Sequence, residues 1–452
     1  MSPGRPARPR LSWSDLCRRR VGLWGLGVEG QAGLRRLRTL DTEPVLVDDR
    51  PTAEAVAAGA LATGAGGLEA LLACEVVVKS PGLSRYRDDV RRLERAGIPV
   101  VGGLGLWLEE ADPGRVVCIT GTKGKSTTTA IAAHLLGGLG HRALAGGNLG
   151  TPPYDPAVGN AYDVWVIEVS SYQATDVAST PPVTAVTSLH PDHLPWHRQR
   201  AETYFADKLS LCHQPGAELT IANGDSGLLR ARQDQLGPRV RWVHAHDQPG
   251  AGWLARLGLL GDHNRRNALI AQACLVALGI PEADDDEALT RAAEGLQPME
   301  GRLRPVGSVG DVLFVDDSLS TNVLPTLAAL DAFSGRRIAL LLGGTDRGID
   351  YGPLADGLAG RLWPTLVLVT ESETRPAMTE VLHARPLGPH VEVRSTGDVN
   401  EAARAGWSWA RPDGVVLLSP AAPSFDRYAD YRAKGAAFAA AIDACRRTAG
   451  NV

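Results

Sequence analysis

The sequence predicts an α/β protein with three domains in series, each built on a mostly parallel sheet. Short apolar runs alternate with helical stretches along the chain, as in β-α-β units. Most of these runs end in glycine, hydroxyl or carboxylate residues, which parallel sheets collect at the edge where ligands bind. The chain has 452 residues, and a domain of typical size has about 150, so two or three cores are expected.

Composition narrows the class of function. The 47 basic and 51 acidic residues give a net charge of −4, which favours neither nucleic acid nor an anionic membrane as a partner. The 6 cysteines are scattered and form no Cys-x-x-Cys pair, so they indicate neither zinc nor a disulfide framework. No apolar run reaches the roughly 18 residues of a membrane-spanning helix. We expect a monomeric, cytoplasmic enzyme with small, diffusible substrates.

The first segment, residues 1–112, opens like a Rossmann-like domain. An apolar run at Val21–Trp24 enters the glycine-rich turn Gly25–Gly30, and a second apolar run ends at Asp48. Glycines at this spacing let the backbone approach a diphosphate, and an acidic residue about twenty positions later can bind a ribose hydroxyl. The motif alone is weak and would suggest NAD, which leaves a nicotinamide-dependent oxidoreductase open.

The second segment, residues 113–302, carries the most informative motif. GTKGKST at 121–127 follows the apolar run Val116–Ile119 and precedes a helical stretch. In such a loop, backbone N–H groups and the helix N-terminus converge on phosphate oxygens, Lys125 adds a full positive charge, and Ser126 or Thr127 can ligate Mg²⁺. The loop is shorter than G-x-x-x-x-G-K-[ST], because Ile119 stands where that pattern has its first glycine. It predicts a P-loop ATPase-like domain that binds ATP.

Two more apolar runs of this segment end in polar clusters. Glu168 closes the run that begins at Val164, and His190 and His193 follow the run at Ala185–Ser188. Because the carboxyl ends of parallel strands share one edge, these side chains should lie beside the phosphate loop. His190 and His197 are interpreted as structural, and His193 alone would be too.

The third segment, residues 303–452, repeats the alternation and predicts a second Rossmann-like domain. Its candidate strands also end in polar or glycine-rich residues, and they are Val312–Val315, Ile338–Leu342, Leu366–Val369 and Val415–Leu418. Three such domains suggest a substrate held at one end, ATP in the middle and a domain that closes over them.

Stretches from the whole chain together resemble one known family: GTKGKSTTT at 121–129, GGNLGTP at 146–152, IEVSSYQ at 167–173, PDHLPWH at 191–197, ADKLSL at 206–211, HNRRNALIA at 263–271, DDSLSTN at 316–322, LLGGTDRG at 341–348 and LLSPAAPSFDRYADY at 417–431. The chain resembles the Mur ligases, ATP-dependent enzymes that build the peptide stem of peptidoglycan, and among them the glutamate-adding MurD type.

The resemblance implies a chemical route and a set of catalytic residues. The γ-phosphoryl group of ATP would pass to the carboxylate of UDP-N-acetylmuramoyl-L-alanine, and the amine of glutamate would attack the resulting acyl phosphate. Lys125 and one Mg²⁺ would hold the phosphates, with Ser126 and Glu168 as metal ligands, and a second Mg²⁺ would be bound near His193 and Lys208. An ammonium would repel a metal, so the resemblance implies that Lys208 is carbamylated. The alternative is an ordinary surface lysine.

The resemblance also assigns the binding residues. Those for ATP are Gly121, Thr122, Lys123, Gly124, Lys125, Ser126, Thr127, Thr128, Asn264, Asn267, Arg302 and Asp317. Those for the UDP-substrate are Gly25, Gly27, Gly30, Asp48, Ser80 and Asn148. Those for the incoming glutamate are Thr321, Arg347, Ser424 and Tyr431. Arg302 could instead form a linker salt bridge, and the segment that begins at Ser80 could be a simple turn.

Two residues bear on the stereochemistry of the added amino acid. Leu319 and Arg347 both stand where D-glutamate-adding enzymes of the family generally carry lysine, and a planar guanidinium binds a carboxylate differently from a point charge. These departures resemble the branch that adds L-glutamate, which would require an epimerase to invert the residue later. A D-glutamate ligase and a folylpolyglutamate-type ligase are the alternatives. The folate enzymes lack a separate domain ahead of the lysine loop.

Overall fold

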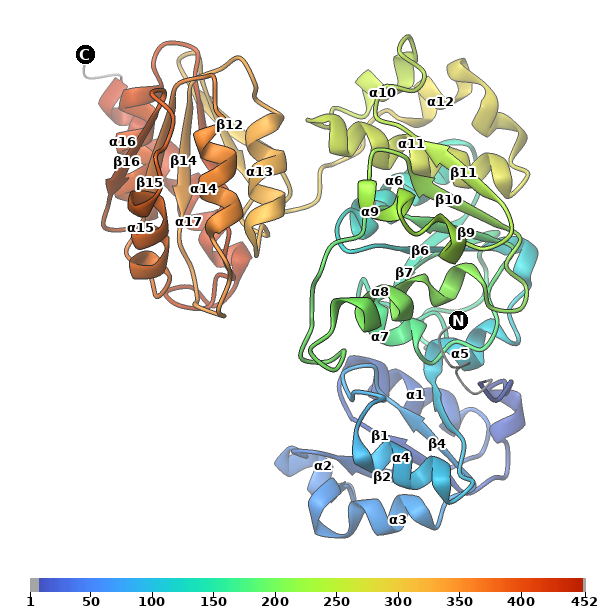
Figure 1. Ribbon diagram of the computed structural model, residues 1–452. Helices are drawn as coiled ribbons and strands as arrows, with labels where there is room; N and C mark the ends of the chain where they lie inside the picture. Colours follow the sequence, from blue (N-terminus) through green and yellow to red (C-terminus); the bar gives the residue numbers. More distant parts are fainter. Residues whose placement is uncertain (1–7, 450–452) are drawn as a thin grey trace. The chain divides into compact units, whose positions relative to one another are not determined.

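The computed structural model describes residues 8–449 (Figure 1). Residues 1–7 and 450–452, at the outer ends of the predicted first and third domains, lie outside the described residues. The described chain forms three separate sheets. Two compact units contain them: unit 1 runs to Leu257 and includes Asn264–Leu296, and unit 2 comprises Gly258–His263 and Gln297–Val452. Residues 297–302, assigned from sequence to the central segment, thus belong to unit 2.

The N-terminal sheet of unit 1 has five parallel strands in the order β3-β2-β1-β4-β5. Its strands are β1 (Val21–Trp24), β2 (Val45–Asp48), β3 (Leu61–Ala62), β4 (Val76–Lys79) and β5 (Val100–Gly102), and its helices are α1 (Val28–Arg38), α2 (Ala53–Ala57), α3 (Leu68–Leu72), α4 (Asp88–Arg95) and α5 (Gly103–Leu108). The two central strands, β1 and β4, are buried along their whole length, which explains their continuous apolar sequence.

The second sheet of unit 1 has six parallel strands in the order β11-β10-β9-β6-β8-β7. Its strands are β6 (Val116–Thr120), β7 (Ala143–Gly147), β8 (Val164–Glu168), β9 (Val183–Val186), β10 (Leu219–Asn223) and β11 (Val240–Val243), and its helices are α6 (Lys125–Gly138), α7 (Ser171–Ala174), α8 (Ala201–Leu209), α9 (Gly227–Arg230), α10 (Gly252–Arg256), α11 (Asp262–Ala277) and α12 (Asp286–Ala292). Since β6 pairs with β8 and β9, the segments after all three strands leave the sheet side by side.

The sheet of unit 2 has six strands in the order β12-β13-β17-β14-β15-β16, and only the β12–β13 pair is antiparallel. Its strands are β12 (Arg304–Val309), β13 (Val312–Asp316), β14 (Ile338–Leu342), β15 (Thr365–Val369), β16 (Val391–Ser395) and β17 (Val415–Leu418), and its helices are α13 (Val323–Asp331), α14 (Gly352–Ala359), α15 (Arg375–Ala384), α16 (Val399–Ala410) and α17 (Tyr431–Ala449). Separate apolar cores cover its two faces, as expected for a sheet between helical layers.

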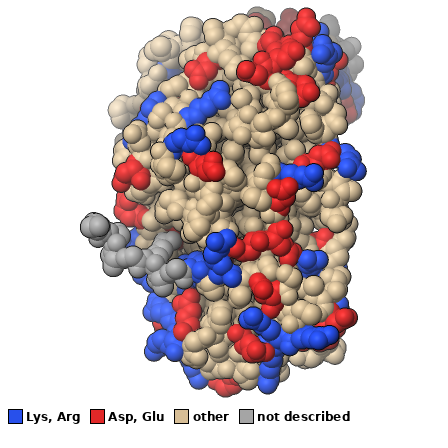
Figure 2. Space-filling view, turned by 90° about the vertical axis from the view of Figure 1, so that its right-hand side faces the viewer, with Lys and Arg blue, Asp and Glu red and all other residues tan. Residues whose placement is uncertain are grey.

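These sheets confirm the predicted α/β class. Every strand that the sequence indicated is present within a residue or two. Some further strands were not expected from the sequence. Among them are β3, which has only two residues, and β16, an edge strand that carries no buried residue. Among residues 8–449, no helix is long and apolar enough to cross a membrane. Figure 2 shows acidic and basic side chains intermixed over one face of the molecule.

Candidate functional site

The loop between β6 and α6 has the geometry of a phosphate-binding turn. Gly124 has a φ of 91°, in the left-handed region, and α6 begins at the next residue, Lys125. A Cβ atom at Gly124 would lie 2.7 Å from Oδ1 of Asn267, so only glycine lets α11 approach the loop this closely. The loop is fixed from the β9 side, since the N–H of Thr122 donates to the Ser188 carbonyl at 2.9 Å.

Three lysines lie around this loop, as the sequence predicts for Lys123, Lys125 and Lys208. Lys208 is only 2% exposed, and its Nζ donates to the Gly121 carbonyl at 2.9 Å. Burial, and then the repulsion of Lys125, holds the pKa of Lys208 well below its ordinary value. Nζ of Lys123 lies 3.2 Å from Oδ2 of Asp192. Lys208 is therefore no ordinary surface lysine, since its buried position favours the neutral amine over the ammonium ion.

His193 faces the same cluster of charges. Burial lowers its pKa, Asp192 opposes that change, and Lys123, Lys208 and Lys125 lower it further. These interactions place the imidazole within electrostatic reach of the phosphate loop. His193 also has a φ of 52°, so its backbone is held in a conformation that a residue with a side chain seldom adopts.

Glu168, at the end of β8, supplies the carboxylate of the site. It is 2% exposed, and its Oε1 accepts a hydrogen bond of 2.6 Å from Nδ2 of Asn148. Its Oε2 is buried and has no hydrogen-bond partner among the described residues. A buried carboxylate oxygen without a partner is costly unless a cation joins it, so this donor fits Mg²⁺.

The first turn of α6 carries three hydroxyl side chains. Ser126 and Thr127 are half-buried, and Thr128 is buried with no partner for its Oγ1 within residues 8–449. In that part of the chain no three His, Cys, Asp or Glu side chains gather as a metal site. Mg²⁺ in phosphate sites takes most of its ligands from phosphate oxygens and water, so one carboxylate and one hydroxyl fit this chemistry.

The glycine-rich turn of the N-terminal domain is also built as the motif requires. A Cβ atom at Gly30 would lie 1.9 Å from the Gly25 carbonyl oxygen, and Oγ of Ser80 donates to that same oxygen at 2.7 Å. Asp48 accepts hydrogen bonds from the backbone N–H groups of Leu26 at 2.7 Å and Arg50 at 2.8 Å. Asp48 thus supports the turn. A Cβ atom at Gly27 would meet nothing within 4 Å.

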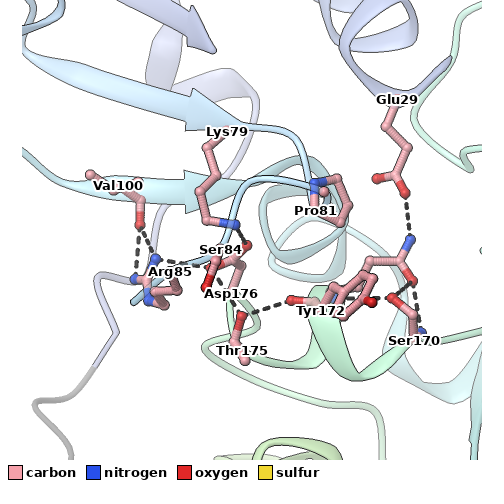
Figure 3. Close-up of polar contacts among 12 residues, drawn as sticks. Glu29, Lys79, Pro81, Ser84, Arg85, Val100, Ser170, Tyr172, Thr175 and Asp176 are labelled. Carbon is pink, nitrogen blue, oxygen red and sulfur yellow. Dashed lines mark hydrogen bonds and ion pairs between the residues drawn. The ribbon is translucent and has the colours of Figure 1, made fainter. Parts of the chain in front are cut away.

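The N-terminal and central domains of unit 1 meet through a buried ion cluster that the sequence did not indicate. Figure 3 shows Lys79 and Arg85 directed at Asp176, which follows α7. Nζ of Lys79 lies 2.6 Å from one oxygen of Asp176, and Nη1 of Arg85 lies 2.9 Å from the other. Lys79 directly precedes Ser80, so the cluster fixes the end of β4 against the central domain.

A second buried contact joins the same domains. Glu29, in the glycine-rich turn, accepts hydrogen bonds from Nε2 of Gln173 at 2.8 Å and from the Tyr154 hydroxyl at 3.1 Å. Gln173 also completes a capping box with Ser170 at the start of α7. Burial raises the pKa of Glu29 to about 6, although both hydrogen bonds lower it. The G-x-G-x-x-G pattern contains Glu29 but gives no signal for its partners.

In unit 2, Arg302 and Asp317 lie together. Burial raises the pKa of Asp317 to about 7, against hydrogen bonds from Ser320 and Ser419 and the charge of Arg302. The N–H of Leu303 donates to Oδ1 of Asp317 at 3.0 Å, which ties the segment after Arg302 to the end of β13. The charge of Arg302 thus acts on a buried carboxyl group, that of Asp317.

Two of the residues predicted to bind the incoming glutamate, Arg347 and Ser424, lie in adjoining loops of unit 2. The N–H of Phe425 donates to Oγ1 of Thr345 at 3.0 Å, and the guanidinium of Arg347 lies 5.4 Å from the Phe425 ring centre. Ser424 is 2% exposed, and its hydroxyl has no partner among the described residues. A buried hydroxyl without a partner is suited to a polar ligand.

Tyr431 and Thr321 are less closely tied to these loops. Tyr431 begins α17, and a Cβ atom at Gly301 would lie 2.9 Å from its ring. Thr321 is half-buried just before α13. Sequence reasoning missed Lys434, one helical turn after Tyr431, which donates to the Gly343 carbonyl. Burial lowers the pKa of Lys434 to about 8. In the sequence, the only indication of a role for Lys434 was its position in the first turn of α17.

Comparisons with known proteins agree with this geometry. Family models described as "Mur ligase middle domain" and "Mur ligase, glutamate ligase domain" match residues 119–248 and 301–422. An enzyme of Xanthomonas axonopodis pv. citri named UDP-N-acetylmuramoyl-L-alanine--L-glutamate ligase is 39% identical over 94% of this chain and 95% of its own. An enzyme of the same name from Salinispora tropica is 36% identical over 97% of this chain and 99% of its own.

A solved structure shows the same fold. MurF ligase from Thermotoga maritima, determined in complex with ADP, matches with a TM-score of 0.56 at 14% identity and covers 97% of this chain and 99% of that chain. The similarity to the curated enzymes includes the N-terminal domain as well as the two matched family domains. The chain belongs to the Mur ligase family and is an ATP-dependent ligase.

Proposed function

We propose that this enzyme joins L-glutamate to UDP-N-acetylmuramoyl-L-alanine at the expense of ATP, in the synthesis of peptidoglycan precursors. The observation that carries the proposal is the 36–39% identity, over nearly the whole chain, to enzymes with that name. Leu319 and Arg347 support the L-enantiomer, because the lysines typical of D-glutamate-adding enzymes are absent at both positions.

The residues have distinct roles in this reaction. Lys123 and Lys125 hold the β- and γ-phosphates of ATP, while the substrate carboxylate approaches the γ-phosphoryl group. Two anions repel each other strongly, and the half-buried cations Lys123 and Lys125 offset that repulsion. Mg²⁺, when bound to Glu168 and Ser126, neutralises further charge on the phosphates. Excluding water from this site protects the acyl phosphate from hydrolysis until the amine of glutamate attacks it.

Lys208 acts as a carbamate rather than as an ammonium. Burial and the charge of Lys125 lower its pKa and so favour the neutral amine, which adds to CO₂ to form an N-carboxylate and release a proton. The carbamate converts a cation into an anionic oxygen donor, which suits a second Mg²⁺ shared with His193. The buried position of Lys208 beside two other lysines supports this assignment, because a negative charge there relieves their mutual repulsion.

The remaining assignments follow the domains. Residues 1–112 bind the UDP moiety through Gly25, Gly27, Gly30, Asp48 and Ser80, with Asn148 of the second domain near the sugar-peptide. Residues 113–302 bind ATP through 121–128, Asn264, Asn267 and Arg302. Residues 303–452 contribute Asp317 to the nucleotide site and Thr321, Arg347, Ser424 and Tyr431 to glutamate. The enzyme acts as a monomer in the cytoplasm, where ATP is available, and an epimerase inverts its product later.

Phosphate release with each glutamate enantiomer tests the proposal. Purified enzyme is given ATP, Mg²⁺, UDP-N-acetylmuramoyl-L-alanine and either L- or D-glutamate, with Lys125→Ala as the inactive control. We expect rapid release with L-glutamate and at least tenfold slower release with D-glutamate. A preference for D-glutamate would assign the chain to the other glutamate-adding branch. No release with either would remove the glutamate assignment.

A further inference from the structure

A chain of buried hydrogen bonds runs behind the phosphate loop of unit 1. Asp207 lies on α8 and accepts a hydrogen bond of 2.7 Å from the Tyr86 hydroxyl at one carboxylate oxygen. Its other oxygen lies 2.5 Å from Nδ1 of His197. Nε2 of His197 lies 3.0 Å from the hydroxyl of Ser171. The side chains of Asp207 and His197 are both 0% exposed.

The Tyr86 hydroxyl donates to Asp207. The ring of His197 joins the Asp207 carboxyl group, at Nδ1, to the Ser171 hydroxyl, at Nε2, and its tautomer sets which nitrogen donates. The order Ser-His-Asp resembles that of a hydrolase, but Ser171 is 3% exposed and begins α7, so its hydroxyl cannot reach a substrate.

Each member of the chain lies on a segment that also carries a residue of the proposed site. Asp207 directly precedes Lys208 on α8. His197 lies four residues after His193 in the segment between β9 and α8. Ser171 lies three residues after Glu168. Tyr86 comes from the N-terminal domain, six residues after Ser80.

The segment that carries His193 needs such support. No helix or strand forms between β9 and α8, and His193, Arg198 and Gln199 have φ values of 52°, 59° and 58°. Backbone in this region is unfavourable for residues with a side chain and persists only where surrounding contacts hold it. His197 is the buried anchor of the segment, and its ring stacks at 5.7 Å on Tyr172 of α7.

We propose that Asp207 and His197 are positioning residues for the ligase reaction, which fix Lys208, His193 and Glu168 relative to one another. Tyr86 links this arrangement to the domain that holds the UDP-substrate. The inference rests on the proposed function, because it gives these residues a task in the same site. It assigns them no direct contact with a substrate. Their effect is on the geometry of the metal-binding groups that they support.

The variant Asp207→Asn tests the proposal, because it keeps the size of the side chain but removes its charge and one acceptor oxygen. We expect kcat to fall about 10- to 100-fold, the range typical of residues that orient metal ligands, while KM for ATP and for L-glutamate changes less than about threefold. The Mg²⁺ concentration that gives half-maximal activity should rise about tenfold. The double variant Asp207→Asn/His197→Ala should be no slower than the slower single variant, because the pair acts as one unit.

Two measurements separate positioning from loss of folding. The melting temperature and the Kd of a non-hydrolysable ATP analogue, measured by calorimetry, should stay close to those of the wild type. The matched control is Asp163→Asn, which removes an exposed carboxylate paired with Arg142 just before β8, and it should leave kcat and the Mg²⁺ requirement unchanged. If Asp207→Asn does not fold, Tyr86→Phe carries the test, since it deletes one oxygen atom. It should lower kcat about threefold or more.

These experiments distinguish a failure of the proposed function from a failure of the positioning role. Wild-type enzyme that releases no phosphate with either glutamate enantiomer would contradict the proposed function. Active wild type together with folded Asp207→Asn of unchanged kcat and Mg²⁺ requirement would overturn the positioning role alone. Unchanged kcat in Tyr86→Phe would do the same where Asp207→Asn cannot be obtained. An unchanged kcat together with a raised KM for the UDP-substrate would assign the pair to substrate binding instead.

Discussion

At the scale of single residues, the site is organised by charges that are buried before any ligand arrives. Lys208 is almost fully buried, and Oε2 of Glu168 has no partner among the described residues. Both conditions cost free energy in a protein that binds nothing. This cost is explained if phosphate, a metal ion and CO₂ bind at the site. Substitutions of Lys208 and Glu168 therefore test the proposed site most directly.

Lys208→Arg should inactivate the enzyme although it keeps the positive charge, because a guanidinium cannot form a carbamate. Lys208→Ala should be equally inactive, but about 50 mM acetate or formate should restore part of its activity by supplying the missing carboxylate, as the proposed second Mg²⁺ site requires. Phosphate release with and without the added acid measures this. Acetate or formate should not restore activity to Lys208→Arg. Full activity of Lys208→Arg would contradict the proposed carbamate.

Glu29→Gln should stabilise the protein at neutral pH. Burial raises the pKa of Glu29 from 4.5 to about 6, so its ionised form costs the folded state about 2 kcal/mol. The folded state binds the proton more tightly, so wild-type stability is fully present below pH 4.5 and is lost as pH rises through about 6. The melting temperature of Glu29→Gln should therefore exceed that of the wild type at pH 7.5, and the difference should vanish near pH 4.5.

The control for that series is Glu380→Gln, at an exposed glutamate on α15 of unit 2. It should show the same small difference from the wild type at every pH. A melting-temperature difference for Glu29→Gln that is independent of pH between 4.5 and 7.5 would show that the carboxyl group is not buried in its ionised form.

At the scale of elements, the β6–α6 turn has no room for a side chain at Gly124. Gly124→Ala would place a methyl group 2.7 Å from Oδ1 of Asn267 at a φ of 91°. We expect ADP affinity to fall at least tenfold, measured by calorimetry. Gly137→Ala, later in α6 where a Cβ atom meets nothing within 4 Å, is the matched control and should be neutral or slightly stabilising. Equal ADP affinity in both variants would remove the turn from the nucleotide site.

The same element shows what sequence alone could predict. The phosphate loop was predictable because its residues are consecutive and follow a fully buried strand, whose apolar run has few other interpretations. Short or exposed strands such as β3 and β16 carry no such run. The partners of Lys79, Tyr86 and Glu29 were not predictable, because they lie 97, 121 and 144 residues further along the chain. Only the folded topology brings them together.

At the scale of the whole molecule, the two compact units differ in how they are held together. Unit 1 contains two sheets that are joined by buried charges, whereas unit 2 is built on one sheet with an apolar core on each face. Asp176 accepts from both Lys79 and Arg85, so its loss would leave two buried cations without their carboxylate.

Asp176→Ala should therefore destabilise unit 1 by about 3–5 kcal/mol and leave unit 2 unaffected. Scanning calorimetry should show one transition moved to lower temperature while the other stays in place. The control, Asp163→Ala, removes a carboxylate of an exposed ion pair and should leave both transitions in place. Equal shifts in both transitions, or none, would argue against two units that unfold separately.

The stereochemistry of the product tests the central claim most directly. The enzyme is incubated with ATP, Mg²⁺, UDP-N-acetylmuramoyl-L-alanine and racemic glutamate, and the purified product is hydrolysed and resolved on a chiral column. The account predicts one ADP per molecule of product and glutamate that is almost entirely the L-enantiomer. Product that contains D-glutamate, or ADP formation without any product, would contradict it.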